Sequence, residues 1–442
     1  MEWVALTDQA VAERFRGMEQ VLSQEDLPVE AERCFYCYDA PCTQACPAEI
    51  DIPAFIRALA VEQPERAADI ILRENPLGMS CARVCPVETL CENVCVRLTD
   101  AGGAVRIGLL QRAAMAAWTP RAKEHPHPLG QRVAVVGAGP AGMTAARLLA
   151  EEGVQVTVLD AAGHPGGLNE TGIAAYKMLD DAAQKEASWL LDHPSIEFVR
   201  GIALGSDFTL ASLRQQYRAV ILAIGLAGQR QLRIPGEDLP GVWTAVPFIA
   251  AMRRGEAVPV GKKVAVIGGG MTAIDIAIQI RLLGAEEVHI CYRRGIEDMG
   301  ASAHERRLAQ AQGVLIHPGL RPLEVRQAAD GGLELIMEPL RAGAEGTWIP
   351  AGKPECWQVD QIFTAIGQCL DRSAWMEDAE LMSLALDAHG KIAVDDAGCT
   401  SLPDVWAVGD CAGRSSDLTV QAVADAKRAV VSILSDWKQE AA

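Results

Sequence analysis

Two short apolar runs that each lead into a glycine-rich turn constrain the fold of this chain more than any other feature. Residues 133–136 are Val-Ala-Val-Val and precede Gly137, and residues 264–267 are Val-Ala-Val-Ile and precede Gly268. An alanine-rich segment with helical character follows each turn. A buried strand, a glycine-rich turn and a helix in this order are typical of a doubly wound parallel sheet. We therefore expect two related dinucleotide-binding folds in one chain.

The first turn has the spacing Gly-x-Gly-x-x-Gly, with Gly137, Gly139 and Gly142. Such glycines permit a tight turn, let the backbone approach a pyrophosphate and let the helix pack on the strand. The next strand ends in Asp160, whose carboxylate is placed to accept hydrogen bonds from ribose hydroxyls. We predict a dinucleotide site here, and a turn that serves only packing is the alternative. The turn residues expected at the cofactor are Gly137, Gly139, Pro140 and Ala141.

The second turn begins at Gly268 and has Ala273 in place of the third glycine, a replacement that the pattern permits. The next strand is followed by Arg293 and Arg294, with no acidic residue where the ribose-binding carboxylate would lie. Guanidinium groups in this place suit a 2′-phosphate, so the sequence somewhat favours NADPH over NADH. A solvated basic edge is the alternative.

Three later strands also end in glycine. Residues 220–224 precede Gly225 and residues 362–366 precede Gly367, and we expect these strands to join a flavin domain to an inserted nicotinamide domain. The third strand ends in Gly409-Asp410, and a helix opens after it near Leu418. A helix N-terminus directs free N–H groups at an acceptor, which fits a flavin ring or a phosphate.

Eight of the 13 cysteines lie in one short region near the N-terminus. They form two runs, Cys34, Cys37, Cys42 and Cys46, then Cys81, Cys85, Cys91 and Cys95. Closely spaced thiolates followed by proline are typical of 4Fe–4S ligands, so we predict two clusters. Two structural zinc sites are the alternative, but four cysteines in 13 residues ending in Cys-Pro do not resemble paired zinc knuckles. A disulfide framework would suit a small exported domain.

The charge and hydropathy of the chain exclude some classes of function. The net charge is −18, which disfavours non-specific binding to nucleic acid or to an anionic membrane. No apolar run approaches the roughly 20 residues of a membrane-spanning helix. Residues 1–12 carry no basic start or cleavage signal, so we expect a cytoplasmic protein.

The pattern of apolar residues is helical before residues 120–130, a predicted linker that contains His125. After the linker it indicates strands that alternate with helices. The expected fold class is α+β multidomain, with a helical domain that holds two 4Fe–4S clusters before two Rossmann-like domains, the second inserted in the first. The expected domains are 1–130 for iron–sulfur binding, 131–258 and 362–442 for FAD, and 259–361 for NAD(P)H.

These motifs together resemble the N-terminal electron-input part of dihydropyrimidine dehydrogenases and, more distantly, the small subunit of bacterial glutamate synthase. The resemblance covers nearly the whole chain. Its most specific parts are residues 34–47, Asp51-Ile-Pro-Ala-Phe-Ile, 81–86 and 107–111. The Asp-Ala-Pro-Cys run at 39–42 is more similar to the pyrimidine branch.

The resemblance implies that the cluster ligands interleave along the chain. One cluster would be held by Cys34, Cys37, Cys42 and Cys95. The other would be held by Cys46, Cys85, Cys91 and the amide oxygen of Gln111. Cys81 would then be a spectator. Spacing alone leaves open the simpler assignment of four cysteines to each cluster, with Gln111 an ordinary helix residue.

The resemblance also implies the cofactor contacts. For FAD they are Gly137, Gly139, Asp160, Gly167, Leu168, Lys177, Gly409, Asp410, Thr419 and Val420. For NADP(H) they are Gly268, Gly270, Thr272, Arg293 and Arg294. Three positions depart from the family pattern, Met271, Ala174 and Gly300, and they weaken the nucleotide preference. Lys177 is also compatible with a solvated helical lysine.

The implied activity is transfer of hydride from a nicotinamide to flavin, followed by single-electron transfer through the clusters. This step requires no general acid or base, so we name no catalytic side chain. By resemblance, the partner is an FMN- and iron–sulfur-containing subunit that reduces pyrimidines, and the enzyme is a hetero-oligomer. The alternatives are a glutamate synthase small subunit, a stand-alone diaphorase and a zinc-stabilised scaffold without activity.

Overall fold

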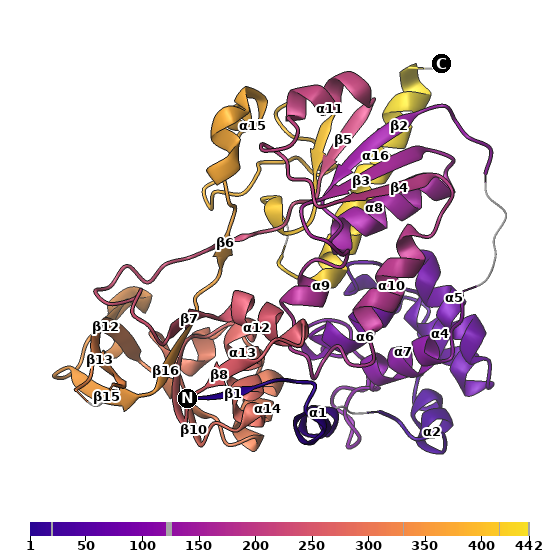
Figure 1. Ribbon diagram of the computed structural model, residues 1–442. Helices are drawn as coiled ribbons and strands as arrows, with labels where there is room; N and C mark the ends of the chain where they lie inside the picture. The colour runs from indigo at the N-terminus through magenta and orange to yellow at the C-terminus, as the bar shows by residue number, and fades with distance from the viewer. Residues whose placement is uncertain (19–20, 121–125, 330, 415, 441–442) are drawn as a thin grey trace. The chain divides into compact units, whose positions relative to one another are not determined.

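A computed structural model describes residues 1–18, 21–120, 126–329, 331–414 and 416–440 (Figure 1). The chain divides into two compact units, and each unit is assembled from three stretches of sequence. Unit 1 comprises residues 1–19, 171–179 and 229–368, and unit 2 comprises residues 20–170, 180–228 and 369–442.

Unit 2 contains a five-stranded parallel sheet. Its strands, in spatial order, are β18 (Val405–Ala407), β5 (Ala219–Leu222), β2 (Arg132–Val136), β3 (Gln155–Asp160) and β4 (Ile196–Arg200). The β-branched and aliphatic residues of β18, β5, β2 and β3 are buried, as expected for a parallel sheet covered on both faces, whereas those of the edge strand β4 are half-buried. Its helices include α8 (Pro140–Glu151), α9 (Leu168–Thr171), α10 (Ala182–Leu191), α11 (Leu210–Gln216), α15 (Ala379–Ser383) and α16 (Thr419–Glu440).

The cysteine-rich part of unit 2 is helical, as the sequence predicts. Its helices are α2 (Asp26–Glu32), α3 (Pro41–Gln44), α4 (Ile52–Ala60), α5 (Pro64–Glu74), α6 (Gly78–Val84) and α7 (Ile107–Ala116). Asp51 caps α4 by accepting a hydrogen bond from Ala54 N at 3.1 Å. Side chains of this part, such as Ile71, share one continuous apolar core with β2 and α8, represented by Val133 and Leu149. The helices therefore do not form a separate body.

Unit 1 contains a second five-stranded parallel sheet. Its strands, in spatial order, are β11 (Leu315–Pro318), β10 (Glu287–Tyr292), β9 (Lys263–Gly268), β16 (Gln361–Ala365) and β7 (Val242–Thr244). An antiparallel sheet is made by β12 (Leu320–Gln327), β13 (Leu333–Ala342), β14 (Trp348–Pro350) and β15 (Glu355–Val359). The helices are α1 (Gln9–Arg16), α12 (Ala245–Arg253), α13 (Met271–Leu283) and α14 (Ala303–Ala311). The two expected parallel sheets are thus present.

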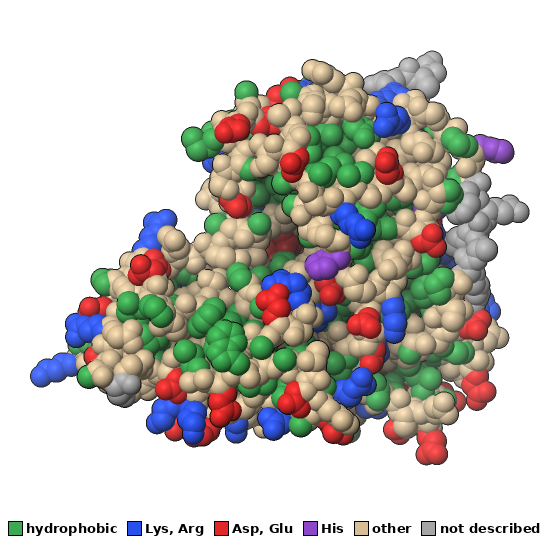
Figure 2. Space-filling model, in the orientation of Figure 1, with side chains coloured by type: hydrophobic (Ala, Val, Ile, Leu, Met, Phe, Trp, Pro, Cys, Tyr) green, Lys and Arg blue, Asp and Glu red, His purple; other side chains and the backbone are tan. Residues whose placement is uncertain are grey.

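The smaller elements complete the chain. Two short strands, β6 (Gly228–Gln229) and β17 (Gln368–Cys369), pair with each other where the sequence passes between the units. The 3-10 helices are Val87–Thr89, Ile296–Asp298, Ala344–Gly346, Ser373–Glu377 and Gly409–Cys411. No helix in the described part of the chain combines the length and apolar character needed to cross a bilayer. On the face shown in Figure 2, acidic and basic side chains are interspersed.

The first residues differ from the expected organisation, which groups them with the helical iron–sulfur domain 1–130. Strand β1 (Glu2–Val4) pairs antiparallel with β8 (Val258–Val260) of unit 1. Phe15 of α1 is buried in the core of that unit, and Arg14 Nη1 donates to Leu282 O at 3.1 Å. The partner of a three-residue strand lies far along the sequence, so local patterns do not reveal it.

The inserted segment also has different limits from the expected 259–361. Unit 1 begins at 229 because β7 joins the parallel sheet through β16. Residues 171–179 belong to unit 1 as well, since Ala175 N donates to Gln279 Oε1 at 2.9 Å. The four expected ranges divide the chain more finely than the two units do and stay a prediction. Of the expected linker 120–130, residues 121–125 lie outside the described residues.

Candidate functional site

The first glycine-rich turn lies in unit 2, between β2 and the start of α8. Gly137 has a φ of +107°, and a Cβ there would stand 2.2 Å from Ala223 O. A Cβ on Gly142 would stand 1.9 Å from Gly137 O. Only glycine fits these two positions, so the turn is shaped by its own backbone before any ligand binds.

Asp160, at the end of β3, is held against this turn. Its Oδ2 accepts a hydrogen bond from Ala138 N at 2.5 Å, and its Oδ1 accepts one from Ala162 N at 2.6 Å. Two backbone donors fix the orientation of the carboxylate at the carboxyl end of the sheet. That is the place from which an acidic residue reaches a ribose in dinucleotide-binding folds.

A second loop covers the turn. Gly167 has a φ of +55°, and a Cβ there would stand 2.8 Å from Gly139 Cα. After Leu168, the buried Asn169 accepts a hydrogen bond at Oδ1 from Thr419 Oγ1 at 2.7 Å. The loop is therefore tied to the N-terminus of α16.

The carboxyl end of β18 reaches the same region. A Cβ on Gly409 would stand 2.9 Å from Ala141 Cβ, so this strand end lies close to the start of α8. These contacts bring together the expected FAD residues of unit 2, which are Gly137, Gly139, Pro140, Ala141, Asp160, Gly167, Leu168, Gly409, Asp410, Thr419 and Val420.

Asp410, in the turn that follows β18, has a perturbed carboxyl group. Burial raises the pKa of its carboxyl to about 6, and the carboxylates of Asp417 and Asp425 add to the rise. Lys391 opposes it. The protein thus keeps a carboxylate in a place that disfavours its charge, which is common at sites that bind a ligand.

Lys177, expected among the FAD contacts, belongs to unit 1. Its Nζ is 2.7 Å from Asp275 Oδ1 on α13 and 2.8 Å from Glu305 Oε1 on α14. Burial lowers the pKa of Lys177, but the two carboxylates more than offset this and raise it above its ordinary value. The structure therefore places this lysine in a buried ion-pair network.

The second glycine-rich turn lies in unit 1, between β9 and α13. A Cβ on Gly268 would stand 2.2 Å from Ala365 O, and one on Gly269 would stand 2.4 Å from the ring of Tyr292. At Gly270, by contrast, no heavy atom of the described residues lies within 4 Å of the Cβ position, outside its neighbours in the chain. Gly270 is the N-cap of α13, so this helix end is open to a ligand.

Arg293 and Arg294 follow β10 and are exposed. The guanidinium of Arg294 lies 5.5 Å from the ring centroid of Tyr292, and its carbonyl accepts from Gly319 N at 2.9 Å. The expected nicotinamide residues thus lie at the carboxyl ends of β9 and β10, and they are Gly268, Gly270, Thr272, Arg293 and Arg294.

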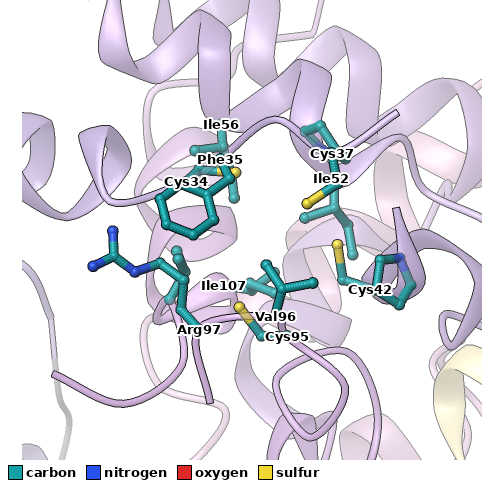
Figure 3. Close-up of a pocket in the computed structure, with 13 residues that line it drawn as sticks. Cys34, Phe35, Cys37, Cys42, Ile52, Ile56, Cys95, Val96, Arg97 and Ile107 are labelled. Carbon is teal, nitrogen blue, oxygen red and sulfur yellow. The ribbon is translucent and has the colours of Figure 1, made fainter. Parts of the chain in front are cut away.

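A pocket in the helical part of unit 2 is lined by four cysteines (Figure 3). They are Cys34, Cys37, Cys42 and Cys95, and they come from both cysteine runs. Apolar side chains such as Ile52, Ile56 and Ile107 form much of the remaining wall. Burial raises the pKa of the Cys42 thiol to about 11, with backbone hydrogen bonds from Thr43 opposing the rise. The chain folds so that the runs interleave at this pocket.

The other cysteines form a second group. A hydrogen bond with Cys81 and burial raise the pKa of Cys85 well above its ordinary value, and Cys46 and Cys91 act in the same direction. Gln111, buried on α7, donates from Nε2 to Gly78 O at 2.9 Å, at the start of the helix that carries Cys81. Whether Cys81 or Gln111 would complete the expected second cluster stays a prediction.

The donor set fits iron–sulfur clusters. Within the described ranges, no three His, Cys, Asp or Glu side chains are grouped so that they could hold one metal ion. The thiols of the first group instead surround a cavity. In a 4Fe–4S cluster each thiolate binds a different iron, which suits ligands arranged around a volume.

Three residues near these sites escaped sequence reasoning. Asn169 could have been found, since it directly follows the Gly-Gly-Leu run. Glu186 accepts from Met79 N at 2.7 Å and Ser80 N at 3.1 Å at the start of α6, and burial raises its pKa to about 7. Arg97 lines the cysteine pocket. No local pattern marks the last two, because the backbone amides that Glu186 binds, and the Arg33 carbonyl and Phe35 ring that Arg97 contacts, are distant in sequence.

Comparison with protein families gives two matches. The model described as pyridine nucleotide-disulphide oxidoreductase matches residues 131–426. The model described as dihydropyrimidine dehydrogenase domain II, 4Fe-4S cluster, matches residues 11–122. The first covers both glycine-rich turns, and the second covers the eight clustered cysteines.

Curated relatives cover most of the chain. The glutamate synthase (NADPH) small chain of Escherichia coli is 31% identical over 93% of this chain and 92% of its own length. The NAD-dependent dihydropyrimidine dehydrogenase subunit PreT of Escherichia coli is 32% identical over 79% of this chain and 81% of its length. The putative oxidoreductase UacF of the same organism is 33% identical over 94% of this chain and 68% of its own length.

Solved structures show the same fold at low identity. FprA of Mycobacterium tuberculosis, in complex with NADPH, matches with a TM-score of 0.58 and 19% identity over 71% of this chain and 86% of FprA. The thioredoxin reductase of T. acidophilum matches with a TM-score of 0.54 and 20% identity over 69% of this chain and 97% of its own.

Proposed function

We propose that this chain is the electron-input subunit of a dihydropyrimidine dehydrogenase. The chain belongs to the pyridine nucleotide-disulphide oxidoreductase family and carries a 4Fe–4S domain. It is therefore an NAD(P)-dependent flavin oxidoreductase. In this function the chain oxidises NAD(P)H at FAD. Electrons then pass through two 4Fe–4S clusters to an FMN- and iron–sulfur-containing partner subunit that reduces uracil or thymine to the 5,6-dihydro form.

The observation that carries the proposal is that one compact unit holds both the flavin-type turn and the cysteine pocket. Their shared apolar core is reinforced by Lys427 of α16, whose Nζ donates to Ala48 O at 2.9 Å and pairs with Glu74 at 2.7 Å. A two-electron site and single-electron sites built on one core keep a fixed separation, as electron transfer between them requires.

The residues of the chain bind and orient the cofactors. The turn at Gly137–Gly142 and the start of α8 bind the FAD pyrophosphate, and Asp160 holds a ribose. The N-terminus of α13 at Gly270 binds the nicotinamide dinucleotide, while Arg293 contacts a 2′-phosphate. The bound flavin supplies the conversion of a hydride into single electrons. The side chains need not move a proton for this step.

The proposed ligands of the first cluster are the four cysteines of the pocket, Cys34, Cys37, Cys42 and Cys95. Those of the second are Cys46, Cys85, Cys91 and the amide oxygen of Gln111. The bond from Gln111 Nε2 to Gly78 O supports this role, because it leaves the oxygen as the atom that a metal would take.

A glutamate synthase small subunit is the second candidate. It is favoured by the relative of that name, which matches this chain over 93% of its length. The same cofactors would then feed a glutamate-forming partner. A stand-alone NAD(P)H:acceptor oxidoreductase would use the cofactors without a partner.

The test begins with an anaerobic absorption spectrum of the purified chain and a count of iron, sulfide, zinc and flavin. We expect about eight irons and one FAD per chain. Titration with NADH and with NADPH then identifies the donor that bleaches the spectrum. Addition of a candidate partner with uracil, or with 2-oxoglutarate and glutamine, separates the two branches. Zinc without flavin would overturn the proposal.

A further inference from the structure

The pocket of four cysteines has one charged residue in its wall. Among the described residues that line it, Arg97 alone carries a charge, and the rest of the wall is thiol or apolar. Figure 3 shows Arg97 beside Phe35 and near Cys95. A guanidinium remains protonated at every accessible pH, so this wall carries a permanent positive charge.

The guanidinium of Arg97 is fixed on three sides. Nε donates to Asp100 Oδ2 at 2.8 Å, and Nη1 donates to Arg33 O at 2.8 Å, one residue before Cys34. The central carbon lies 4.7 Å from the ring centroid of Phe35. The charge therefore cannot swing into solvent without the loss of two hydrogen bonds and a stacking contact.

The countercharge cancels this field only in part. The side chain of Arg97 is 25% exposed, whereas that of Asp100 is 39% exposed and thus better screened by water. Asp100 is also absent from the residues that line the pocket, which include Arg97. In a wall of apolar side chains, the nearer charge acts through a lower effective dielectric constant.

We propose that Arg97 sets the reduction potential of the cluster held by Cys34, Cys37, Cys42 and Cys95. The inference rests on the proposed function, and it assigns a role to a residue that none of the cofactor contacts above includes. Each reduction adds one electron, which originates from NAD(P)H and arrives through the flavin, and no bond to Arg97 forms or breaks. A fixed cation stabilises that added negative charge and so raises the potential.

A purely structural role is the competing explanation, because Arg97 also anchors the residue before Cys34. Two substitutions separate the roles. Arg97→Gln removes the charge and retains a hydrogen-bonding side chain. Arg97→Lys keeps the charge but loses the planar fork and most of the stacking on Phe35. Arg66→Gln is the matched control, since Arg66 is an exposed arginine of the same helical part that does not line the pocket.

The experiment is a redox titration of the full chain with its flavin and clusters, followed by electron paramagnetic resonance at low temperature. In Arg97→Gln, we expect the midpoint potential of one cluster signal to fall while the other stays unchanged. Arg97→Lys is expected to lie close to the parent, and Arg66→Gln to match it. Equal shifts in Arg97→Gln and Arg97→Lys, or no shift in either, would overturn the proposal.

A second variant covers the case in which Arg97→Gln fails to assemble. Asp100→Asn leaves the cation in place and removes its countercharge, so the same midpoint potential should rise. A fall, or no change, would contradict the proposal. Iron and flavin are counted on each preparation. If the parent chain itself lacks the clusters, the proposed function fails. If the parent chain holds them and only the midpoint potentials disagree, the role of Arg97 alone fails.

Discussion

The two glycine-rich turns have nearly the same backbone and very different surroundings. In unit 2, the Asp160 carboxylate is held by two backbone donors, and Gly167 packs against Gly139. In unit 1, Gly270 faces open space among the described residues, and Arg293 is exposed. Similar turns would thus suit two kinds of site. We infer that unit 2 is built to retain its nucleotide, and unit 1 to exchange it.

The largest expected effect comes from a substitution in the glycine-rich turn of unit 2, which we infer retains its nucleotide. Gly137→Ala places a Cβ 2.2 Å from Ala223 O, a backbone atom that cannot move aside, at a φ of +107°. We expect the purified variant to lose its flavin almost completely, measured by absorbance after gel filtration. Gly163→Ala is the control, because no described heavy atom lies within 4 Å of its Cβ position. Full flavin content in Gly137→Ala would show that the turn does not hold the cofactor.

The next effect concerns the pH dependence of the retaining site. The pKa of Asp410 is raised to about 6 in the folded chain, so its contribution to stability is complete below its ordinary pKa of 3.8 and is lost as the pH rises through about 6. The loss is roughly 3 kcal/mol at its full extent. Asp410→Asn should therefore raise the thermal midpoint of flavin-free protein at pH 7 more than at pH 5.

The same substitution should weaken flavin binding if the carboxylate is kept for the cofactor. A variant that gains stability at pH 7 and keeps full flavin affinity would assign Asp410 no part in the site. Asp396→Asn serves as the control, because Asp396 is an exposed carboxylate of the same unit.

A smaller effect is expected in the glycine-rich turn of unit 1, which we infer exchanges its nucleotide. Gly270→Ala adds a methyl group into open space at a φ of −91°, so folding and flavin content should be unchanged. The methyl group would occupy the path of a pyrophosphate, and we expect kcat/KM for the nicotinamide donor to fall about tenfold or more, a change of about 1.4 kcal/mol per factor of ten. An unchanged kcat/KM would remove this helix end from the site.

The smallest effect reports which nucleotide is exchanged. Arg293→Gln should raise KM for NADPH several-fold and leave KM for NADH within about twofold, because only the former carries a 2′-phosphate. Steady-state dye reduction with each donor measures this difference. Equal changes for both donors would make Arg293 a general surface charge.

Local patterns predicted the sheets and turns well, since a buried strand and a glycine turn are encoded by adjacent residues. Gly137 and Gly268 lie where the patterns place them. Distant pairings were not predictable. The side chain of Lys177 forms ion pairs with Asp275 on α13 and Glu305 on α14, and no local sequence pattern predicts either pair. Spacing likewise located the cysteines, whereas their grouping joins residues far apart in the sequence, such as Cys34 and Cys95.

The pairing of β1 with β8 has a consequence for the order in which the chain can fold. Residues 2–4 leave the ribosome about 250 residues before residues 258–260, their partners in the sheet. At about 5–20 residues per second, translation leaves β1 unpaired for roughly 10 to 50 s. During that interval the backbone N–H and C=O groups of Trp3 and its neighbours lack the hydrogen-bond partners that β8 later supplies. The segment can then pair with other extended chains, as an exposed edge strand does. Chaperones that bind short apolar segments would meet the protein at this stage.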